Sequence, residues 1–583
     1  MKNINLSELS NGTTRMFLRR QQRHSSFIQP NTWVHCYHPT ELNTDTQNDC
    51  LYVRNNSRCK EYVQLINYLE FIVCKIGATS SISGLIQIFA CTSILLCFYF
   101  LGLIVIGRYF LIPNILTMNK IFRFPDFEFG YSIITFFMVF CDFIEAVIKC
   151  YTYEGMASLE ISENIGQVLC TLSVGMIVFG FSKKFHRYQS SHFLRLILML
   201  FFGLTYLVWI LDYKQQQDEE YNSATGVDVN LKIHAAGMVI VYALILFFTL
   251  ALIKRIPIAD IKRMEEQSFD NRNRLFPEDK QLLMYIYTFN PFANMKNWKL
   301  PTVLTAVIQY LFICKCVICL HYFYNFKTPL WVLAALQIPV VDQNRPMNGW
   351  SRNAVLISFF TFPLILCMYF NSVIALYIGL PFGVIAALVT HCTTEVDRKP
   401  SFHEQIYSIY GVAVAMFWIY LIDNEIENIV WQLATYLGNW SIDTIVLTTF
   451  PAGFGIIVYT ICSTLVSQDR GELALGVLTG ISVFCTYFPL AVVKFRICST
   501  KYDKVVVTAN TYTGFVFMLL ILVYTMVYVF ILRYELRRSY GYAVLTEYIV
   551  YLIVMLLSEF QAIHPYGATH AILKGAPQSA YWS

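Results

Sequence analysis

The chain has 583 residues, of which 56% are hydrophobic and only 14% are charged, and its mean hydropathy is +0.50. Soluble proteins carry roughly a quarter charged residues, so the composition excludes an ordinary soluble protein and indicates an integral membrane protein surrounded by lipid. The formal net charge of +5 is small for this length and gives no reason to expect a nucleic-acid partner.

Residues 1–82 form a polar N-terminal segment. Its first 25 residues are rich in Arg, Ser and Asn and nearly free of acids, which fits a disordered tail better than the organelle transit peptide that it weakly resembles. Cys50, Cys59 and Cys74 flank the polar part, and we expect a disulfide among them if the segment faces an oxidising compartment. The 17 cysteines show no His/Cys cluster with the spacing of a zinc site.

Twelve apolar runs follow, each about 20 residues long and so long enough to cross a bilayer as a helix. In the first transmembrane half, residues 83–255, they lie at 84–107, 129–150, 161–181, 192–211 and 232–254. In the second half, residues 353–566, they lie at 353–371, 373–392, 405–423, 443–466, 472–493, 511–533 and 541–563. Residues 256–352 are expected to form a cytosol-side loop with a thirteenth, amphipathic or re-entrant segment at 301–322, and residues 567–583 a short tail. The sequence thus predicts an all-α polytopic membrane protein.

The positive-inside rule orients these spans, because cytoplasmic loops carry an excess of Lys and Arg. With the N-terminus outside, loops 108–128 and 183–191 fall inside with three basic residues each, and the acidic loop 212–231 falls outside. The basic segment after residue 254 also falls inside, whereas the basic loop 494–504 falls outside, against the rule.

The order of the spans suggests a duplication. The last five spans, 405–563, can be laid over the first five, 84–254, and under this topology the two sets have opposite orientation. An inverted repeat of two five-helix halves is typical of secondary transporters, whose substrate site lies near the midplane where the repeats meet.

The run TFFMVFCDFIEAVIKCY, residues 135–151, places three charges inside a predicted span. Asp142, Glu145 and Lys149 have the spacing i, i+3, i+7, which puts them on one face of a helix. Each single charge at the bilayer centre costs on the order of 2.5–3.5 kcal/mol on insertion scales, so three of them must pair or face a wet cavity. Glu145 can pair with Lys149, which leaves Asp142 for a cation.

The next predicted span adds Glu163, Asn164 and Gln167. Carboxylate and amide oxygens on two adjacent helices are hard ligands that suit Ca²⁺, Na⁺ or H⁺. The alternative is that these acids lie near helix ends and are solvated, an explanation that fits Asp142, in the middle of its span, less well.

In the second half, a polar run begins at the end of a predicted span: Asp423, Glu425, Glu427 and Asn428. The run is interpreted either as a polar rim or as an acidic vestibule that concentrates cations, with Glu425 and Asn428 as accessory residues. The last span carries Glu547 and Glu559, 12 residues apart. Glu559 is assigned to the same accessory group.

Five stretches within residues 50–566 carry a family resemblance: CLYVRNNSRCKEYVQLINYLEFIVC, YFLIPN, FNPF, LQIPVVDQNRPMN and RRSYGYAVLTEYIVYLIVMLLSEFQAIHPY. In their order and spacing they resemble the cation/calcium exchanger superfamily, specifically its mitochondrial-type sodium/calcium exchanger branch. The resemblance implies one ion-binding motif in each repeat, with the patterns Gly-Asn-Gly-x-Pro-Asp and Gly-Asn-Ser-x-x-Asp. In the family, the Asn and Asp oxygens of these motifs coordinate Na⁺ and Ca²⁺.

The first motif of the resemblance falls on residues 137–142. Asp142 is kept there, but Phe137 and Met138 stand where the family has Gly and Asn. The first half of the site therefore keeps one carboxylate and loses an amide.

The second motif falls on residues 453–458, where Gly453 is kept, Phe454 stands for the Asn and Val458 for the Asp. A family Asn on the following helix corresponds to Cys485. The resemblance to the fold is therefore retained, while most of the Asn and Asp residues that bind ions in the family are replaced in this chain.

Calcium takes roughly six to eight oxygen ligands, so other groups must compensate for the lost ones. The predicted cation-binding residues are Asp142, Glu145, Glu163, Asn164, Gln167, Thr448, Thr449 and Gly453. The stretch LTTFPAGFG is expected to break its helix, because it contains Pro451 and two glycines.

The sequence thus predicts a secondary active cation antiporter, with calcium exchanged for sodium or another monovalent cation by alternating access at a degenerate site. The alternative is a transport-inactive relative that acts as a membrane binding or regulatory protein, which the lost ligands favour. The spans contain no metalloprotease or nucleophile-elbow motif, so we expect no enzyme and no cofactor, only inorganic cations such as Ca²⁺ and Na⁺ as transported partners.

Three sequons fall outside in the predicted topology, at Asn11, Asn55 and Asn439, and the last two are the candidate glycosylation sites. We expect an integral protein of the plasma membrane or of an intracellular membrane, and the mitochondrial inner membrane is one of the candidates.

Overall fold

The structure is a computed structural model, and it describes residues 50, 53–54, 66–76, 82–140, 143–144, 157–182, 190–220, 229–251, 253, 257, 330, 333–342, 346–370, 373–395, 398–437, 442–449, 451–488, 509–559 and 562–563. Every element in these residues is a helix, which confirms the predicted all-α class. A helix satisfies its own backbone hydrogen bonds, so it is the element that long apolar runs form in lipid.

The elements follow the predicted runs in chain order. The N-terminal half contains α4 (Tyr68–Glu70), η3 (Phe71–Ile76), α5 (Ile82–Ile106), η4 (Gly107–Leu111), α6 (Ile112–Phe122), α7 (Asp126–Phe129), η5 (Gly130–Ile134), α9 (Ala157–Phe181), α10 (Ser190–Glu220) and α11 (Val229–Ala251). The C-terminal half contains η7 (Pro346–Gly349), α16 (Arg352–Phe370), α17 (Val373–Thr393), α18 (His403–Leu437), α19 (Ile442–Thr448), α20 (Pro451–Ser467), α21 (Gly471–Tyr487), α23 (Ala509–Ile531) and α24 (Arg538–Glu559). The expected segment at 301–322 lies outside the described residues.

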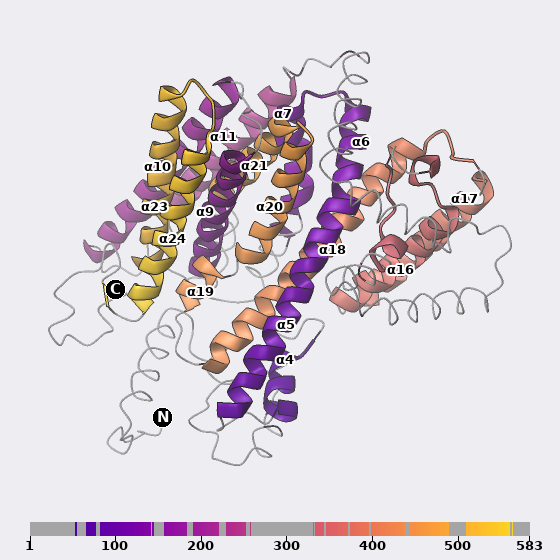
Figure 1. Ribbon diagram of the computed structural model, residues 1–583, viewed down its shortest axis with the longest axis horizontal. Coiled ribbons are helices and arrows are strands. Elements are labelled where there is room, and N and C mark those ends of the chain that lie inside the picture. The colour runs from indigo at the N-terminus through magenta and orange to yellow at the C-terminus, as the bar shows by residue number, and fades with distance from the viewer. Residues whose placement is uncertain are drawn as a thin grey trace.

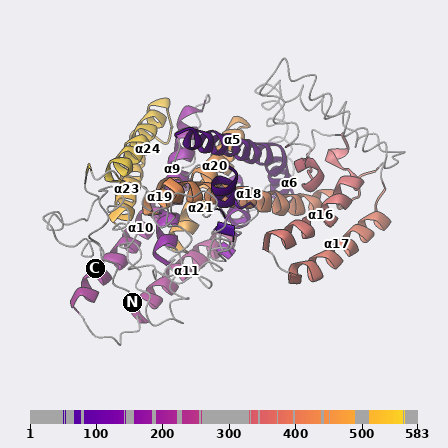
Figure 2. The same ribbon diagram turned by 90° about the horizontal axis from the view of Figure 1, so that it is seen from below.

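The helices form three groups in space (Figures 1 and 2). One side is a bundle that contains α9, α10, α20, α21, α23 and α24. The long helices α5–α6 and α18 run beside this bundle and pack on each other. The pair α16–α17 stands at the opposite side, where its two helices pack closely together.

The first helix is longer than the sequence predicted. It continues from α5 through η4 and α6 to Phe122, so the expected loop 108–128 is helical over most of its length. Tertiary contacts explain the extension: the Asn114 amide donates to the carbonyl of Pro339 (3.0 Å) and accepts from the amide of Val341 (2.8 Å). The helix ends at Arg123, whose backbone is left-handed (φ 57°).

The two halves of the chain interlock through α9 and α21. α9 contacts α19, α20, α21 and α24 of the second half, and α21 contacts α7 and η5 of the first. Glycines allow this approach: a Cβ at Gly476 would fall 2.2 Å from the Phe127 carbonyl oxygen. Small residues at crossings are how membrane helices pack. Two repeats that meet at one site would pair in this way, and their inverted orientation stays a prediction.

Seven helices of the described residues are long and apolar enough to cross a membrane: Ile86–Phe122, Ile161–Phe181, Ser191–Ile210, His234–Ala251, His403–Val430, Asn510–Ile531 and Arg538–Ser558. Four apolar helices are shorter: Arg352–Cys367, Gly379–Thr393, Pro451–Ser467 and Gly471–Tyr487. Large apolar side chains such as Phe202, Phe247 and Phe382 are exposed (62, 64 and 72%), as expected for faces in contact with lipid. The chain is therefore an integral membrane protein, and a count of about twelve spans stays a prediction.

Candidate functional site

Several predicted site residues lie outside the part of the chain that the structure describes. These are Asp142 and Glu145 of the first motif region and the sequon residues Asn55 and Asn439. Glu559 ends α24, and its side chain is outside the described part as well. Their predicted roles stay predictions, and the site is built below from the other residues.

The predicted break in the span 443–466 is confirmed. α19 ends at Thr448, and α20 begins at Pro451, which has no backbone N–H to donate to the preceding turn. The Thr448 hydroxyl donates to the carbonyl of Thr444 and lies 3.3 Å from the Thr449 hydroxyl. Two hydroxyl groups thus stand at the interruption, both on half-buried side chains.

α9 packs against this break and carries three of the predicted polar residues. Glu163, Asn164 and Gln167 are all half-buried on α9. One turn of the same helix carries Gly166, where a Cβ would fall 2.8 Å from the Leu447 carbonyl oxygen of α19. The polar residues of α9 and the Thr pair therefore come from two elements in direct backbone contact.

A contact across the halves involves the position where the resemblance implies an Asn. The Cys485 thiol of α21 donates to the side-chain oxygen of Gln167 (3.5 Å). A thiol is a weak donor and a weak ligand for hard cations. Residue 485 therefore offers a thiol where the resemblance implies an amide oxygen.

A carboxylate from α18 reaches the first turn of α20. A Cβ added at Gly453 would fall 1.9 Å from the Asp423 Oδ1 atom, so the carboxylate rests directly on this glycine. The site of the second motif thus has an acid beside it, from another helix. A carboxylate also interacts favourably with the positive end of a helix dipole, which helps to hold Asp423 there.

Cys170 of α9 completes the junction of α9, α18 and α20. Its buried thiol donates to the Pro451 carbonyl (3.4 Å), and it interacts electrostatically with Asp423. Gly455 lies over the same sulfur, where an added Cβ would be 2.7 Å away. Three helices therefore meet at the interruption that the sequence predicted.

The replaced motif residues of α20 face the apolar core. Phe454 and Val458 are 5% and 2% exposed and belong to the main hydrophobic cluster. Met138, at the corresponding place in the first motif, is 2% exposed. These three residues place apolar side chains where the resemblance implies oxygen ligands. The polar side chains near the break therefore come from α9, from α18 and from Thr448 and Thr449.

The accessory residue Glu425 lies deep inside the protein. It is fully buried on α18, and its carboxylate accepts a hydrogen bond from the Tyr68 hydroxyl of α4 (2.5 Å). The Tyr68 hydroxyl lies 2.9 Å from that of Tyr99 on α5. Burial of this kind does not fit the polar-rim interpretation of Glu425, while Asn428 is half-buried.

Sequence reasoning ended the helix of Glu425 too early. α18 continues to Leu437, so the polar run 423–428 lies inside a helix and not after one. No Gly or Pro occurs between Val412 and Leu437, and this was the signal for a continuous helix. The sequence contained no such signal for two contacts, that of Asp423 with Gly453 and that of Glu425 with Tyr68. Both contacts join residues that belong to different helices.

A second polar cluster lies at the ends of α7, α10 and α21. Arg470 forms an ion pair with Asp126 (3.1 Å), which also accepts from the Asn119 amide (2.7 Å). His192 lies between two acids, 2.8 Å from Glu472 and 3.7 Å from Glu128. In the predicted topology these groups face the cytosol, away from the Glu425 end of α18.

The described residues contain no group of three or more His, Cys, Asp or Glu side chains that could hold a metal ion. Any cation held near the break by these residues must therefore use hydroxyl, amide and backbone oxygens along with single carboxylates. Such a mixed, weakly charged ligand set suits weakly held cations more than a tightly bound ion.

Comparison with known proteins identifies related sequences. The family model described as "Sodium/calcium exchanger protein" matches residues 407–557, which run from α18 into α24. No solved structure matches the chain.

Several relatives carry the name mitochondrial sodium/calcium exchanger protein. The Mus musculus protein is 23% identical over 315 residues, which cover 50% of this chain and 50% of the relative. The Caenorhabditis elegans protein is 26% identical over 189 residues (32% and 28%), and the Homo sapiens protein 24% over 253 residues (41% and 43%). The chain thus spans half or less of the length of the curated relatives that it matches.

Proposed function

This chain is a divergent member of the sodium/calcium exchanger superfamily, and from that premise we propose that it is a secondary active cation antiporter. It exchanges calcium for sodium or another monovalent cation by alternating access. The observation that carries the proposal is the interrupted helix α19–α20, which packs on Asp423 of α18 and on α9, the helix that also carries Glu163, Asn164 and Gln167. Discontinuous helices at the meeting point of two repeats form the ion sites of many secondary transporters.

The chemistry of these groups supports a cation as the substrate. Carboxylate, amide and hydroxyl oxygens are carried by α9, α18 and α19, of which α19 contacts the other two, and the α19–α20 interruption frees backbone carbonyls beside them. These are hard oxygen ligands, which prefer Ca²⁺ and Na⁺ over transition metals. Asp142, from the first motif, supplies the further carboxylate that the site needs.

The site is degenerate, and this shapes the expected transport. With apolar side chains at Met138, Phe454 and Val458, the site offers fewer oxygens than calcium prefers. We therefore propose fewer bound ions per cycle than the full family motifs would hold. A proton or a monovalent ion can take a place that the lost ligands no longer support for calcium.

A transport-inactive role is the second candidate, and the same three buried apolar residues favour it. A chain that keeps the helices but fills the ion-binding positions with core side chains can act as a membrane binding or regulatory protein. This role requires the fold, including the interlocked α9 and α21, and no ion flux.

Ion flux in proteoliposomes distinguishes the two candidates. Radiolabelled Ca²⁺ and Na⁺ uptake is measured under opposing ion gradients for the native chain, for Asp142→Ala and for Glu395→Gln, an acid on the exposed end after α17 (72% exposed). If the chain is an antiporter, the native protein shows gradient-driven ion flux. This flux is lost in Asp142→Ala and unchanged in Glu395→Gln. If the folded native chain shows no ion flux under any gradient, the antiporter proposal is wrong and the transport-inactive role is supported.

The compartment is a separate proposal: the plasma membrane or an intracellular membrane, including the mitochondrial inner membrane. Glycan on Asn55 or Asn439 of the cellular protein would place it in the secretory pathway. An unglycosylated protein that has lost its basic N-terminal residues would place it in mitochondria.

A further inference from the structure

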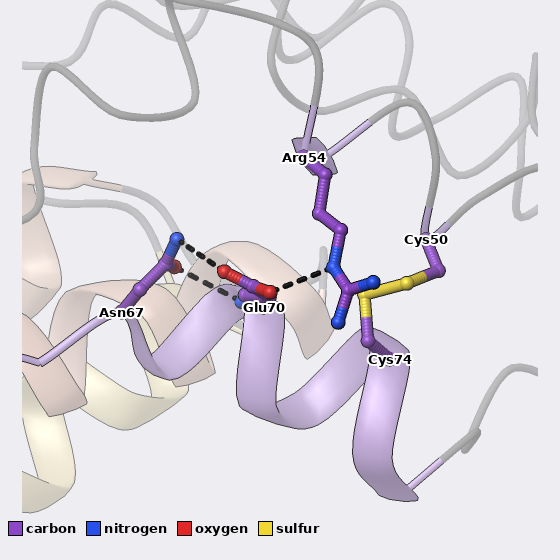
Figure 3. A network of polar contacts seen from close by, with 5 residues as sticks. All are labelled: Cys50, Arg54, Asn67, Glu70 and Cys74. Atoms are coloured by element: carbon purple, nitrogen blue, oxygen red, sulfur yellow. Dashed lines mark hydrogen bonds and ion pairs between the residues drawn. A yellow bond between two sulfur atoms is a disulfide. The ribbon is translucent and has the colours of Figure 1, made fainter.

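The described N-terminal residues form a small unit that lies against two long helices. We name residues 50, 53–54 and 66–76 the clasp. Its disulfide joins Cys50 to Cys74, 24 residues apart, which confirms the expected disulfide and identifies its members. Arg54 pairs with Glu70 (2.8 Å), and Asn67 caps α4 by accepting from the Glu70 amide (3.0 Å) (Figure 3).

The clasp touches both α5 and α18. Ile72 is buried beside Ile88 of α5, and Leu433 of α18 packs on this pair. One turn before Ile72 along the clasp, Tyr68 is 6% exposed and donates to Glu425 of α18, while its hydroxyl also meets Tyr99 of α5. The clasp therefore links these two helices by an apolar contact and by a polar one at a buried acid.

The polar contact depends on a protonated phenol. Burial, together with the hydrogen bond to Glu425, raises the pKa of Tyr68. The hydroxyl thus remains a donor at physiological pH, and the Glu425 carboxylate keeps its partner as long as the clasp stays in place.

We propose that the clasp is a redox-controlled cap, which buries Glu425 through Tyr68 while the Cys50–Cys74 disulfide is intact and uncovers it when the disulfide is reduced. Cleavage of the Sγ–Sγ bond takes two electrons and two protons from a dithiol reductant, which itself closes to a disulfide and leaves two protein thiols. Both cysteines are half-buried, so a small dithiol reaches them. Loss of this crosslink frees residues 66–76 from Cys50 and weakens the hold of Tyr68 on α18.

The effect on transport rests on the proposed function, whereas the uncovering of Glu425 does not. An uncovered carboxylate at this end of α18 attracts cations, and α18 also carries Asp423 at the α19–α20 break. We therefore expect reduction to raise the initial rate of cation uptake at least about threefold, a change of about 0.65 kcal/mol in barrier.

Hydrogen exchange of the folded protein in nanodiscs tests the cap directly. Dithiothreitol is added to the native chain, and amide exchange is compared for the clasp, for the Glu425 region of α18 and for α21 as an internal reference. We expect at least about tenfold faster exchange in the clasp and faster exchange around Glu425, with α21 unchanged. Equal exchange before and after reduction, with reduction of the disulfide verified by mass, would overturn the proposal.

Two variants separate the crosslink from the hydrogen bond. Cys50→Ser should show the fast exchange without reductant, and Tyr68→Phe should expose the Glu425 region while its clasp still responds to dithiothreitol. Cys392→Ser and Tyr377→Phe, at exposed positions of α17, are the matched controls and should behave as the native chain does. A Tyr68→Phe protein with a native Glu425 region would also contradict the proposal.

The flux measurement keeps this inference distinct from the proposed function. Exchange that responds to reduction in a protein with no flux would support the cap and contradict the antiporter. Flux that is insensitive to reductant, with exchange also unchanged, would support the antiporter and contradict the cap.

Discussion

Gly453 is a position where one missing side chain decides the geometry of the junction. The Asp423 carboxylate occupies the space that a Cβ would take, only 1.9 Å from its ideal place. The contact brings an acid to the first turn of α20, one turn or more before Val458, the position where the resemblance implies an Asp. The position of the Asp423 carboxylate therefore depends on the absence of a side chain at Gly453.

Gly453→Ala should therefore disturb both stability and transport. The added methyl group forces Asp423 or α20 to move, and overpacking of this kind costs typically about 1–3 kcal/mol. We expect a lower midpoint in thermal unfolding in detergent and a reduced ion flux. Gly237→Ala on α11 is the matched control, because its Cβ meets nothing within 4 Å; equal midpoints for the two variants would contradict the contact.

Cys485 shows a different kind of change at a single residue. It keeps a contact with Gln167 across the halves, yet it offers sulfur where the resemblance implies an amide. Sulfur is a weak ligand for hard cations, so we expect residue 485 to contribute through this contact and not as an ion ligand.

At the scale of helices, α7 and α21 are held together by packing and by charge. Gly476 lets the two backbones touch, and the Asp126–Arg470 pair closes the same crossing with side chains only 14% and 11% exposed. The crossing joins the first half of the chain to the second. The free energy of this contact therefore contributes to holding the two halves of the chain together at the α7–α21 crossing.

Asp126→Asn should weaken this crossing. Removing one partner of a buried ion pair leaves the other charge uncompensated and costs about 3–5 kcal/mol. We expect a clear loss of stability in chemical unfolding, and a double variant with Arg470→Gln that is less unstable than the sum of the single ones. Arg398→Gln removes a charge from an exposed pair (85% and 72%) and should change the free energy of unfolding by less than about 1 kcal/mol. Additive effects of Asp126→Asn and Arg470→Gln would show that the pair does not couple.

At the scale of the whole molecule, three helices meet at His192. Glu128 of α7, His192 of α10 and Glu472 of α21 form one row of charges, and the ring of Phe127 stacks on that of His192 (3.9 Å). Burial raises the pKa of Glu128, but the interactions with His192, a backbone hydrogen bond and Arg195 lower it more, so that it lies below the ordinary value of 4.5. This cluster ties stability to pH.

The sign of the dependence follows from the lowered pKa of Glu128. A carboxyl that is more acidic in the folded state contributes stability above its ordinary pKa and loses it as pH falls through the folded value. We expect the thermal midpoint of the native chain to fall more than that of Glu128→Gln as the pH is lowered below the ordinary carboxyl pKa of 4.5. Glu404→Gln, an acid at the start of α18, is the control; parallel curves for native and Glu128→Gln proteins would contradict the assignment.

Much of the fold could be predicted from hydrophobic runs. Runs such as 353–371 and 511–533 are helices within a residue or two of the expected bounds, and the break at Pro451 follows from local chemistry. The end of the span at 423 was wrong although the absence of Gly and Pro up to Leu437 was a local signal for a longer helix. The loop 108–128 was wrong because its helix is extended by contacts with remote segments. Local pattern contains no information on such contacts.

Much of the candidate site could not be predicted in the same way. The sequence marked Gln167, the Thr pair and Gly453 as polar or permissive positions, and these lie on α9, α19 and α20, which pack together. It did not indicate that Asp423 would lie against Gly453 or Tyr68 against Glu425, pairs that are separated by 30 and 357 residues. Helical periodicity relates residues of one helix only, and the two residues of each pair lie on different helices. The sequence spacing therefore could not predict either contact.

The sequence by itself determined that this protein is a bundle of apolar helices with a broken span, and it predicted that most oxygens of the two ion-binding motifs are replaced. These properties follow from the free energy of each residue in lipid and from the local chemistry of Pro and Gly. The tertiary structure alone decided which acid meets the broken helix and which tyrosine covers Glu425. Helices are formed by local hydrogen bonds, but their neighbours are chosen by close packing over the whole chain.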